Sequence, residues 1–442
     1  MNRRDFSSSP AWAAPSEPIP GRDFRRPNLL FILADDLGYG DLGCYGCPDI
    51  RTPNLDQLAK EGVRMMNYYA AAPVCTPTRC ALLTGRYPQR VPNLEWALYP
   101  GVKNVGLAAD EITIATQLRD VGYATGLFGK WHLGYRPEWG PNQHGFNEFF
   151  GLLSGNIDYF RHIENNDEPD LYENTTPAVK KGYITDLITE RATDFISRHA
   201  HEPFFLYVAY NAPHFPIQGP GDAGVEITKE NWSKRGERTD YAAVVERMDD
   251  GIGRILNALR AERLSENTLV IFCSDNGGER LARNAPLSGQ KTHLREGGIR
   301  VPCLARWPKV LPAGKVSSQA AITMDLSATL LAAARIRPVR KIDGTPLFPY
   351  LCGIRPEVER TFVWRNDLQG EKAVRWGKWK WLREKGNDFL FDLENDIEET
   401  RDLQDRFFDI LYHLQTVYAS WEKAMPYHQT RFGDDLKTLT LP

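Results

Sequence analysis

The chain is 442 residues long, too long for one small domain, so we expect a large domain with a substantial core and a smaller second domain. Hydrophobic residues make up 42% and charged residues 25% of the chain, and the net charge is -3, so the composition favours neither a nucleic acid nor an anionic membrane as a partner. No apolar run approaches the roughly 20 residues that a membrane-spanning helix requires.

The N-terminal segment has the composition of a tail. Its Arg3-Arg4 pair resembles the start of a twin-arginine export signal, and a stretch rich in Pro, Ser and Ala follows through residue 20. The apolar region that such a signal requires is missing, so a shortened signal and an accidental match are both compatible with the sequence. We expect a disordered tail over residues 1–24.

Short continuous apolar runs predict strands that are buried on both faces of a sheet. They lie at residues 29–33, 123–128, 203–209 and 268–273. Amphipathic patterns between them predict helices: Thr52 and Pro53 begin one that Gly62 can end, and a longer one runs from Tyr241 to Leu259. Buried strands that alternate with helices indicate an α/β fold with a largely parallel sheet flanked by helices.

The residue pattern of the sequence changes after residue 350. Short aromatic-rich segments at 374–382 and 389–393 predict a small antiparallel sheet, and a helix-like region follows near the end. The Gly-rich polar segment at 218–237 predicts a loop. We therefore expect a large domain over residues 25–350 and a small antiparallel α+β domain over residues 351–442.

The seven cysteines are an odd number spread over a long chain, a pattern that does not indicate a disulfide framework. Cys44 and Cys47 form a C-x-x-C pair. A zinc site needs a second pair or histidines at ligand spacing, and none lies nearby in the sequence. We expect the two thiols to be paired or buried.

Polar and ionisable residues follow each of the predicted strands. In chain order they are Asp35 and Asp36, then Lys130 and His132, then His214, then Asp275 and Asn276. Ligands of open α/β sheets bind beyond the carboxyl ends of the strands. Any one of these residues alone is typical of a turn, a helix cap or a structural histidine. Their recurrence at every predicted strand end indicates one shared site.

The residue types at this predicted site favour metal-assisted chemistry on a tetrahedral anion. Oxygen ligands that suit calcium or magnesium are offered by Asp35, Asp36, Asp275 and Asn276. Cationic side chains that can neutralise a sulfate or phosphate are Arg79, Lys130 and Lys291. His132 and His214 can transfer protons near neutral pH.

Cys75 does not follow a predicted strand. Pro77 and the run 78–83 predict a helix that begins close to Cys75, where the positive end of the helix dipole favours an anion. Taken alone, a cysteine at such a position is more typical of a buried, unreactive thiol.

The segment from Cys75 to Arg86, C-T-P-T-R-C-A-L-L-T-G-R, resembles the signature of the type I sulfatase family, in which the cysteine is converted to formylglycine. Thr78 stands where serine is commoner, and Cys80 directly after Arg79 is atypical. The C-x-P-x-R core is intact, which implies conversion by a formylglycine-generating or equivalent maturation enzyme. The resemblance covers most of residues 27–350, with matching segments at 27–41, 129–134, 274–277, 289–302 and 343–344, and later at 391–403.

The resemblance implies an alkaline-phosphatase-like fold with one bound metal ion, calcium rather than magnesium. The implied ligands are Asp35, Asp36, Asp275, Asn276 and the modified Cys75. One hydroxyl of the hydrated aldehyde would attack sulfur and release the alcohol, and the sulfated diol would then collapse and expel sulfate.

The same resemblance implies roles for the remaining residues. Arg79 and His132 would support the aldehyde hydrate and its collapse. Lys130 and Lys291 would hold sulfate oxygens. His214 would assist the leaving group, and Ser154 matches a serine on the substrate side.

These features predict a sulfatase that hydrolyses a sulfate ester on a sulfated sugar or glycan. The alternatives are a phosphonate or phosphate ester hydrolase of the same superfamily and a catalytically inactive protein that binds sulfated glycans. The loops at 92–103, 154–172 and 218–238 are candidates for substrate specificity, but no sequence rule converts them into a sulfate position. Because sulfated glycans lie outside the cytoplasm, we expect a periplasmic or secreted protein.

Overall fold

The computed structural model describes residues 26–99, 102 and 104–426. The tail predicted for residues 1–24 lies outside the described residues.

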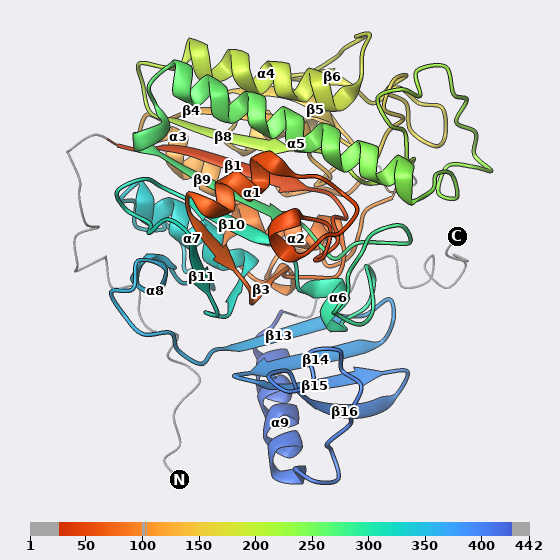
Figure 1. The fold of residues 1–442 in the computed structure, drawn as a ribbon, viewed down its shortest axis with the longest axis vertical. Coiled ribbons are helices and arrows are strands. Elements are labelled where there is room, and N and C mark those ends of the chain that lie inside the picture. Colours follow the sequence, from red (N-terminus) through yellow and green to blue (C-terminus); the bar gives the residue numbers. More distant parts are fainter. Residues whose placement is uncertain (1–25, 100–101, 103, 427–442) are drawn as a thin grey trace.

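A ten-stranded mixed sheet forms the centre of the molecule (Figure 1). Its strands are β1 (Asn28–Ala34), β2 (Val63–Met65), β4 (Ala124–Lys130), β5 (Glu148–Leu152), β6 (Tyr172–Glu173), β7 (Thr176–Pro177), β8 (Phe204–Ala209), β9 (Thr268–Ser274), β10 (Cys303–Arg306) and β11 (Lys315–Ser317). Their order is β11-β2-β10-β9-β1-β8-β4-β5-β6-β7. The central strands from β9 to β5 are parallel, whereas β10 is antiparallel to both of its neighbours and β6 and β7 extend the far edge antiparallel.

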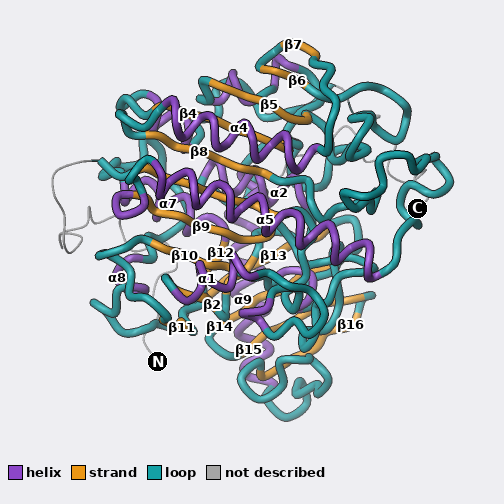
Figure 2. The backbone as a smooth tube through the Cα atoms, turned by 45° about the horizontal axis from the view of Figure 1, so that its top comes forward, coloured by secondary structure: helices purple, strands orange, loops and turns teal. Residues whose placement is uncertain are grey.

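Helices cover both faces of this sheet (Figure 2). On one face lie α1 (Pro53–Lys60), α4 (Ile184–Arg198) and α5 (Arg238–Ala261). On the other lie α2 (Cys75–Thr84), α3 (Ile114–Arg119) and α7 (Thr323–Ala333). The shorter elements of this part of the chain are β3 (Tyr68–Tyr69), α6 (Glu296–Ile299), β12 (Ala321–Ile322) and α8 (Phe348–Leu351).

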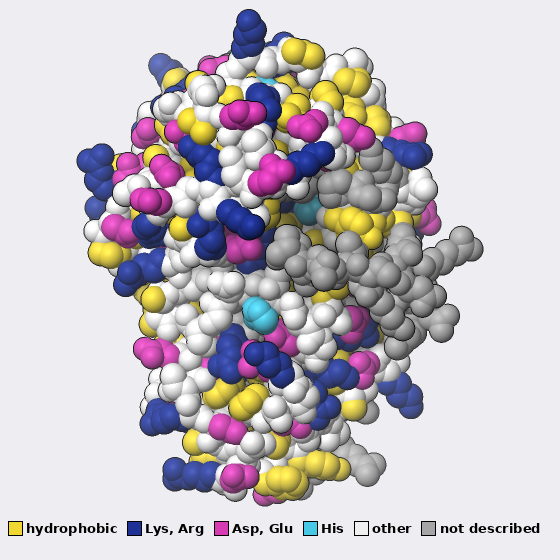
Figure 3. Space-filling model, turned by 90° about the vertical axis from the view of Figure 1, so that its right-hand side faces the viewer, with side chains coloured by type: hydrophobic (Ala, Val, Ile, Leu, Met, Phe, Trp, Pro, Cys, Tyr) yellow, Lys and Arg dark blue, Asp and Glu magenta, His cyan; other side chains and the backbone are white. Residues whose placement is uncertain are grey.

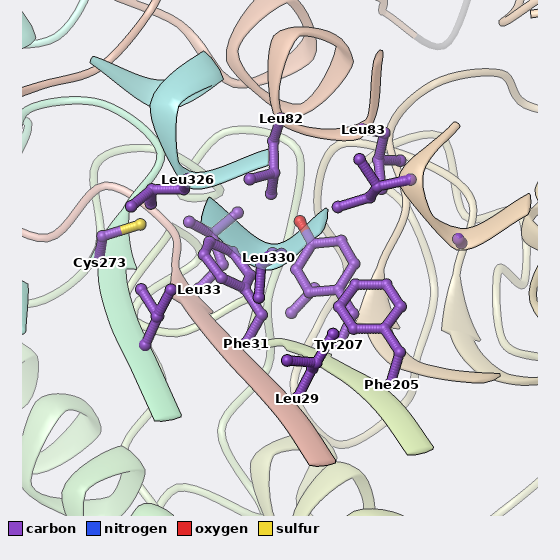
Figure 4. Packing of buried hydrophobic residues seen from close by; sticks show 14 of the residues in the cluster. Leu29, Phe31, Leu33, Leu82, Leu83, Phe205, Tyr207, Cys273, Leu326 and Leu330 are labelled. Atoms are coloured by element: carbon purple, nitrogen blue, oxygen red, sulfur yellow. The ribbon is translucent and has the colours of Figure 1, made fainter. Parts of the chain in front are cut away.

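The position of β1 between two helical layers explains its run of apolar residues. Leu30 and Ile32 pack in the core that includes residues of α1, α4 and α5, whereas Phe31 and its alternate neighbours pack against Leu82 of α2 and Leu330 of α7 (Figure 4). Successive side chains of a strand point to opposite faces, so a strand between two helical layers needs apolar residues at every position. Burying each large aliphatic side chain contributes about 1.5–3 kcal/mol.

A separate four-stranded antiparallel sheet follows, formed by β13 (Thr361–Asn366), β14 (Glu371–Trp376), β15 (Trp379–Glu384) and β16 (Asn387–Asp392). One face packs on α9 (Phe408–Ala424), with Val374 and Leu414 in the shared core. The other face packs on the main body, where Phe362 and Leu382 share a core with Leu294. The small sheet therefore lies directly against the segment that follows Lys291 (Figure 1).

The predicted α/β class with a smaller antiparallel unit is confirmed, with differences in detail. The strand predicted at 123–128 runs from Ala124 to Lys130, so Lys130 ends the strand and does not follow it. The segment 374–382 is two strands joined by a tight turn at Gly377, which has the positive φ that favours glycine there. Cys44 and Cys47 are free and partly buried, so of the two predicted alternatives, pairing and burial, the structure shows partial burial.

Candidate active site

The predicted site residues meet at the carboxyl edge of the central strands. Asp35 and Asp36 follow β1, Lys130 ends β4, and Asp275 follows β9. His214 follows β8 after a short turn. All of these side chains are buried. The structure therefore brings together residues that are 240 or more positions apart in the chain, such as Asp36 and Asn276.

Cys75 is the first residue of α2 and points into this cluster. Ligand atoms of Asp35, Asp36, Cys75 and His214 all lie within 4.8 Å of one another. Thr78 holds the start of the helix, because its hydroxyl donates to Ala72 O at 3.1 Å. Burial raises the pKa of the Cys75 thiol to about 12, so the unmodified thiol is protonated and a poor nucleophile at neutral pH.

Two cations flank Asp35. Lys130 Nζ lies 2.6 Å from Asp35 Oδ2, and Arg79 Nη2 lies 3.5 Å from Asp35 Oδ1. Arg79 also donates to Asp275 Oδ2 at 2.8 Å and to the Lys130 carbonyl at 3.0 Å. Burial raises the pKa of Asp35 to about 8, although Lys130 and Arg79 oppose this shift. Asp35 therefore needs further positive charge to be stable as an anion at neutral pH.

Asp36 has a different environment from Asp35. Lys291 Nζ lies 2.7 Å from Asp36 Oδ2, and Asn276 Nδ2 donates to Asp36 Oδ1 at 2.7 Å. Burial alone would raise the pKa of Asp36, but Lys291 and His214 outweigh it and hold the pKa below its ordinary range. The backbone of Asp36 has φ 63, a conformation that residues other than glycine adopt mostly where their surroundings impose it.

The two histidines are arranged as neutral proton acceptors. His132 Nε2 lies 2.8 Å from Leu98 O and must donate to it, which leaves Nδ1 as the acceptor, and Nδ1 has no partner among the described residues. His214 Nδ1 lies 2.7 Å from Phe215 O and donates likewise, so Nε2 accepts from Lys291 Nζ at 3.1 Å. Burial lowers the pKa of both histidines well below the ordinary value. Both are therefore neutral at neutral pH.

Ser154 lies beside the site but shows no contact with its charged groups in the described part of the chain. Its hydroxyl donates to Asn156 O at 3.2 Å, and its amide donates to Asp170 Oδ2 at 2.8 Å. The next residue, Gly155, lies so close to His132 that an added Cβ would approach the ring Cε1 to 2.8 Å. Ser154 is thus held in place by Asp170.

Three further residues belong to the site and were not predicted. Asn156 Nδ2 lies 3.4 Å from His214 Nδ1, and Glu279 Oε2 lies 3.6 Å from Lys291 Nζ. The Thr76 hydroxyl donates to His132 O at 3.0 Å. Thr76 directly follows Cys75, Asn156 lies two residues after Ser154, and Glu279 lies three residues after Asn276. This proximity to predicted site residues was the signal available for them.

The oxygen donors at this edge fit a hard divalent cation. Asp35 Oδ1 and Asn276 Oδ1 are buried and accept no hydrogen bond within the described residues. A buried oxygen without a donor is unfavourable unless a cation or other donor compensates it. Carboxylate and amide oxygens are the ligands that calcium and magnesium prefer. The donor set and its unsatisfied atoms therefore suit a metal ion.

Comparison with known proteins agrees with this geometry. The Sulfatase family model matches residues 27–336. Human N-acetylgalactosamine-6-sulfatase is 36% identical over 429 residues, which cover 88% of this chain and 79% of that protein. The crystal structure of Ps i-CgsB in complex with k-i-k-neocarrahexaose superposes with a TM-score of 0.84 at 33% identity, covering 93% of this chain and 97% of that one. Phosphonate monoester hydrolase of Agrobacterium radiobacter shares the fold, with a TM-score of 0.65 at 20% identity over 91% of this chain and 96% of that one.

Proposed function

The chain belongs to the sulfatase family, and we propose that its site hydrolyses the sulfate ester of a sulfated carbohydrate, with residue 75 as the nucleophile after conversion to formylglycine. The observation that carries this proposal is the position of Cys75 at the start of α2, among Asp35, Asp36 and His214. The positive end of the helix dipole favours an anionic group at this point. Water supplies the remaining atoms, so that the ester becomes an alcohol and sulfate.

The metal ion that the family implies would be held by oxygens of Asp35, Asp36, Asp275 and Asn276 together with residue 75. Bound there, it would supply positive charge that polarises the sulfate and stabilises the developing negative charge. We propose calcium, because several carboxylate and amide oxygens converge here and suit its larger coordination shell.

Lys130 and Lys291 are proposed to bind the sulfate oxygens. Both ammonium groups are buried and each lies within 2.7 Å of an aspartate oxygen, so they are fixed in direction before substrate arrives. Preorganised charges in a site that excludes water stabilise a transition state more than charges in solvent do. Arg79 is proposed to support them indirectly, since it holds both Asp275 and the Lys130 carbonyl.

His132 and His214 are proposed to move protons. His132 Nδ1 has no partner among the described residues and can accept a proton from a hydroxyl on residue 75. The hydrogen-bonded pair of His214 and Lys291 can supply a proton to the departing alcohol oxygen. Ser154 is proposed to lie on the substrate side, next to the glycine that packs on His132.

A carbohydrate substrate is supported by the relatives. The name of N-acetylgalactosamine-6-sulfatase refers to a sulfated sugar, and the structure of Ps i-CgsB was solved in complex with k-i-k-neocarrahexaose. On the face drawn in Figure 3, Lys and Arg side chains are interspersed with Asp and Glu side chains, so the anionic group would be recognised locally in the buried site. The loops at 154–172 and 218–238 are proposed to select the sugar.

Further parts of the proposal concern the whole protein. We assign the catalytic unit to residues 25–350 and the small unit to residues 351–442. Maturation by a formylglycine-generating or equivalent enzyme and export to the periplasm or outside follow from the proposed chemistry. No helix within the described ranges is long and apolar enough to cross a membrane.

The test is a screen of defined sulfated mono- and oligosaccharides for free sulfate, run beside Cys75→Ala. Cys80→Ala is the matched control, because Cys80 is also buried on α2 but packs in the apolar core. We expect sulfate release that Cys75→Ala abolishes and Cys80→Ala retains. Equal activity of Cys75→Ala and wild type would overturn the proposal.

Two further measurements separate the alternatives. Turnover of an aryl sulfate is compared with that of the matched aryl phosphate and phosphonate at equal concentration. A clear preference for phosphorus would favour the phosphonate or phosphate hydrolase. Binding of a sulfated glycan without sulfate release, by protein that carries the aldehyde, would indicate an inactive glycan-binding protein.

A further inference from the structure

The segment that follows Lys291 is held by the C-terminal sheet at one residue after another. Asn366 of β13 donates to Thr292 O at 2.7 Å. Further along, Arg295 pairs with Glu384 of β15 at 2.8 Å. Residues separated from the segment by some 70 to 100 positions therefore determine where its backbone lies.

Glu371, the first residue of β14, holds the two residues that follow Thr292. Its side chain is 2% exposed. Oε1 lies 2.8 Å from His293 Nδ1, and Oε2 accepts the Leu294 amide at 2.8 Å. A buried carboxylate that accepts two hydrogen bonds fixes both the side chain and the main chain of the segment that it contacts.

A second clamp is a fully buried ion network at the far end of the same segment. Lys380 Nζ lies 2.9 Å from Glu296 Oε1 and 2.8 Å from Glu399 Oε1. Glu399 Oε2 accepts both the Glu296 amide and the Ser288 hydroxyl at 2.7 Å. Ser288 precedes Lys291 and Glu296 follows it. Glu399 therefore connects the two ends of the segment 288–296, which we call the Lys291 loop.

The backbone within this loop is strained. Thr292 has φ 73, which is uncommon for a β-branched residue and persists where surrounding contacts over-determine it. Its amide donates to Pro73 O at 2.9 Å, and the Lys291 amide donates to Gly278 O at 3.1 Å. The strained turn therefore lies between the segment before Cys75 and the segment after Asn276, with the C-terminal clamps on its outer side.

We propose that Glu371 and Glu399 are positioning residues that set the place of the Lys291 ammonium, so that the C-terminal sheet acts as part of the catalytic apparatus through this loop. The inference rests on the proposed role of Lys291 in sulfate binding. In the described part of the chain, neither glutamate forms a hydrogen bond or ion pair with Lys291 or Asp36. Without its clamps the turn at Thr292 relaxes, and the ammonium is no longer held against Asp36.

The test is a double-mutant cycle with Glu371→Ala, Lys291→Ala and the double variant, measured as kcat/KM for sulfate release. We expect Glu371→Ala to lower kcat/KM about 10- to 100-fold, the range for loss of a supporting residue. In the Lys291→Ala background the same substitution should cause little further loss, since the group that it positions is gone. Glu371→Gln keeps an acceptor for the Leu294 amide and should restore part of the activity.

Asp388→Asn is the matched control. Asp388 lies in the same small sheet and accepts from Arg383, Trp381 and Gln415, which all belong to the C-terminal unit. It should leave kcat/KM unchanged even if it lowers the thermal midpoint. Calorimetry of inorganic sulfate binding gives a readout that does not depend on turnover. We expect sulfate to bind more weakly to Glu371→Ala and with unchanged affinity to Asp388→Asn.

The outcomes are distinguishable. If Glu371→Ala lowers kcat/KM by the same factor in both backgrounds, the glutamate acts by general destabilisation and the inference is overturned. If Lys291→Ala keeps wild-type activity, the proposed role of Lys291 fails and the inference fails with it. If Glu371→Ala does not fold, the cycle is completed with Glu371→Gln, and additive losses again overturn the inference.

Discussion

Lys130 Nζ lies 2.6 Å from Asp35 Oδ2, and both side chains are fully buried at the carboxyl edge of the sheet. This contact joins the end of β4 to the end of β1 and fixes an ammonium group beside the residues proposed to hold a metal. The other oxygen, Oδ1, lies 3.5 Å from Arg79 Nη2 but accepts no hydrogen bond within the described residues, so it can still bind a metal ion. The proposed functions of the metal and of the lysines are therefore coupled through one aspartate.

Removing this ammonium should impair catalysis strongly. In Lys130→Met we expect kcat/KM for sulfate release to fall about 100- to 1000-fold, because one preorganised charge at the reacting anion is lost. Lys130→Arg should not restore the rate, since the side chain has no exposed area and a guanidinium does not fit the space of an ammonium. A Lys130→Met enzyme with most of the wild-type kcat/KM would show that this lysine does not bind sulfate.

Metal binding should release protons below pH 8. Burial raises the pKa of Asp35 to about 8, so the metal-free protein carries a proton there at neutral pH, and a cation must displace it. The apparent calcium affinity should rise with pH and level off above this value. Calorimetric titration in buffers of different ionisation enthalpy measures the proton release. Binding with no proton release on either side of pH 8 would contradict this prediction.

His132→Gln should lower kcat more than it changes KM. His132 Nδ1 is proposed to accept a proton during turnover, and glutamine offers hydrogen bonds but no comparable base. Because burial lowers the pKa of His132 well below 6.5, the neutral form is complete at neutral pH. Protonation of His132 should therefore lower kcat/KM only below pH 6.5. An unchanged kcat in the variant would exclude His132 as the base.

Asp249→Ala should affect stability and leave catalysis intact. Asp249 of α5 accepts the Asn54 amide at 3.0 Å and the Leu55 amide at 2.8 Å, so it caps the start of α1 from a neighbouring helix. Loss of a helix cap costs about 1–2 kcal/mol of unfolding free energy. Urea unfolding measures this loss. A large fall in kcat/KM would show that the α1 face is coupled to the site, contrary to this account.

Sequence reasoning found the strands that carry the site. The runs that became β1, β8 and β9 are apolar at almost every position because both faces of the sheet are covered by helices. The edge strands β6 and β7 were not predicted, because two residues are too few to show the alternation of apolar and polar side chains that marks a strand. Helix α7 also escaped, because all of its residues are buried and no polar face marks it.

Part of the site could not be predicted for a different reason. The Leu98 carbonyl fixes the tautomer of His132, and a backbone oxygen leaves no signature in the sequence. The residues that hold the Lys291 loop belong to a sheet whose sequence is that of an ordinary antiparallel unit. Glu371 contacts the loop only because this sheet packs against the main body, and the sequence does not reveal that packing. Contacts between distant segments follow from packing, which local patterns do not encode.

The central claim is that the nucleophile is made from Cys75. Peptide mass spectrometry of the segment that contains residue 75, applied to preparations of different specific activity, tests it most directly. We expect sulfate release to rise in proportion to the fraction of residue 75 present as formylglycine and to vanish where that fraction is zero. Fully active protein in which residue 75 is an unmodified thiol throughout would contradict it.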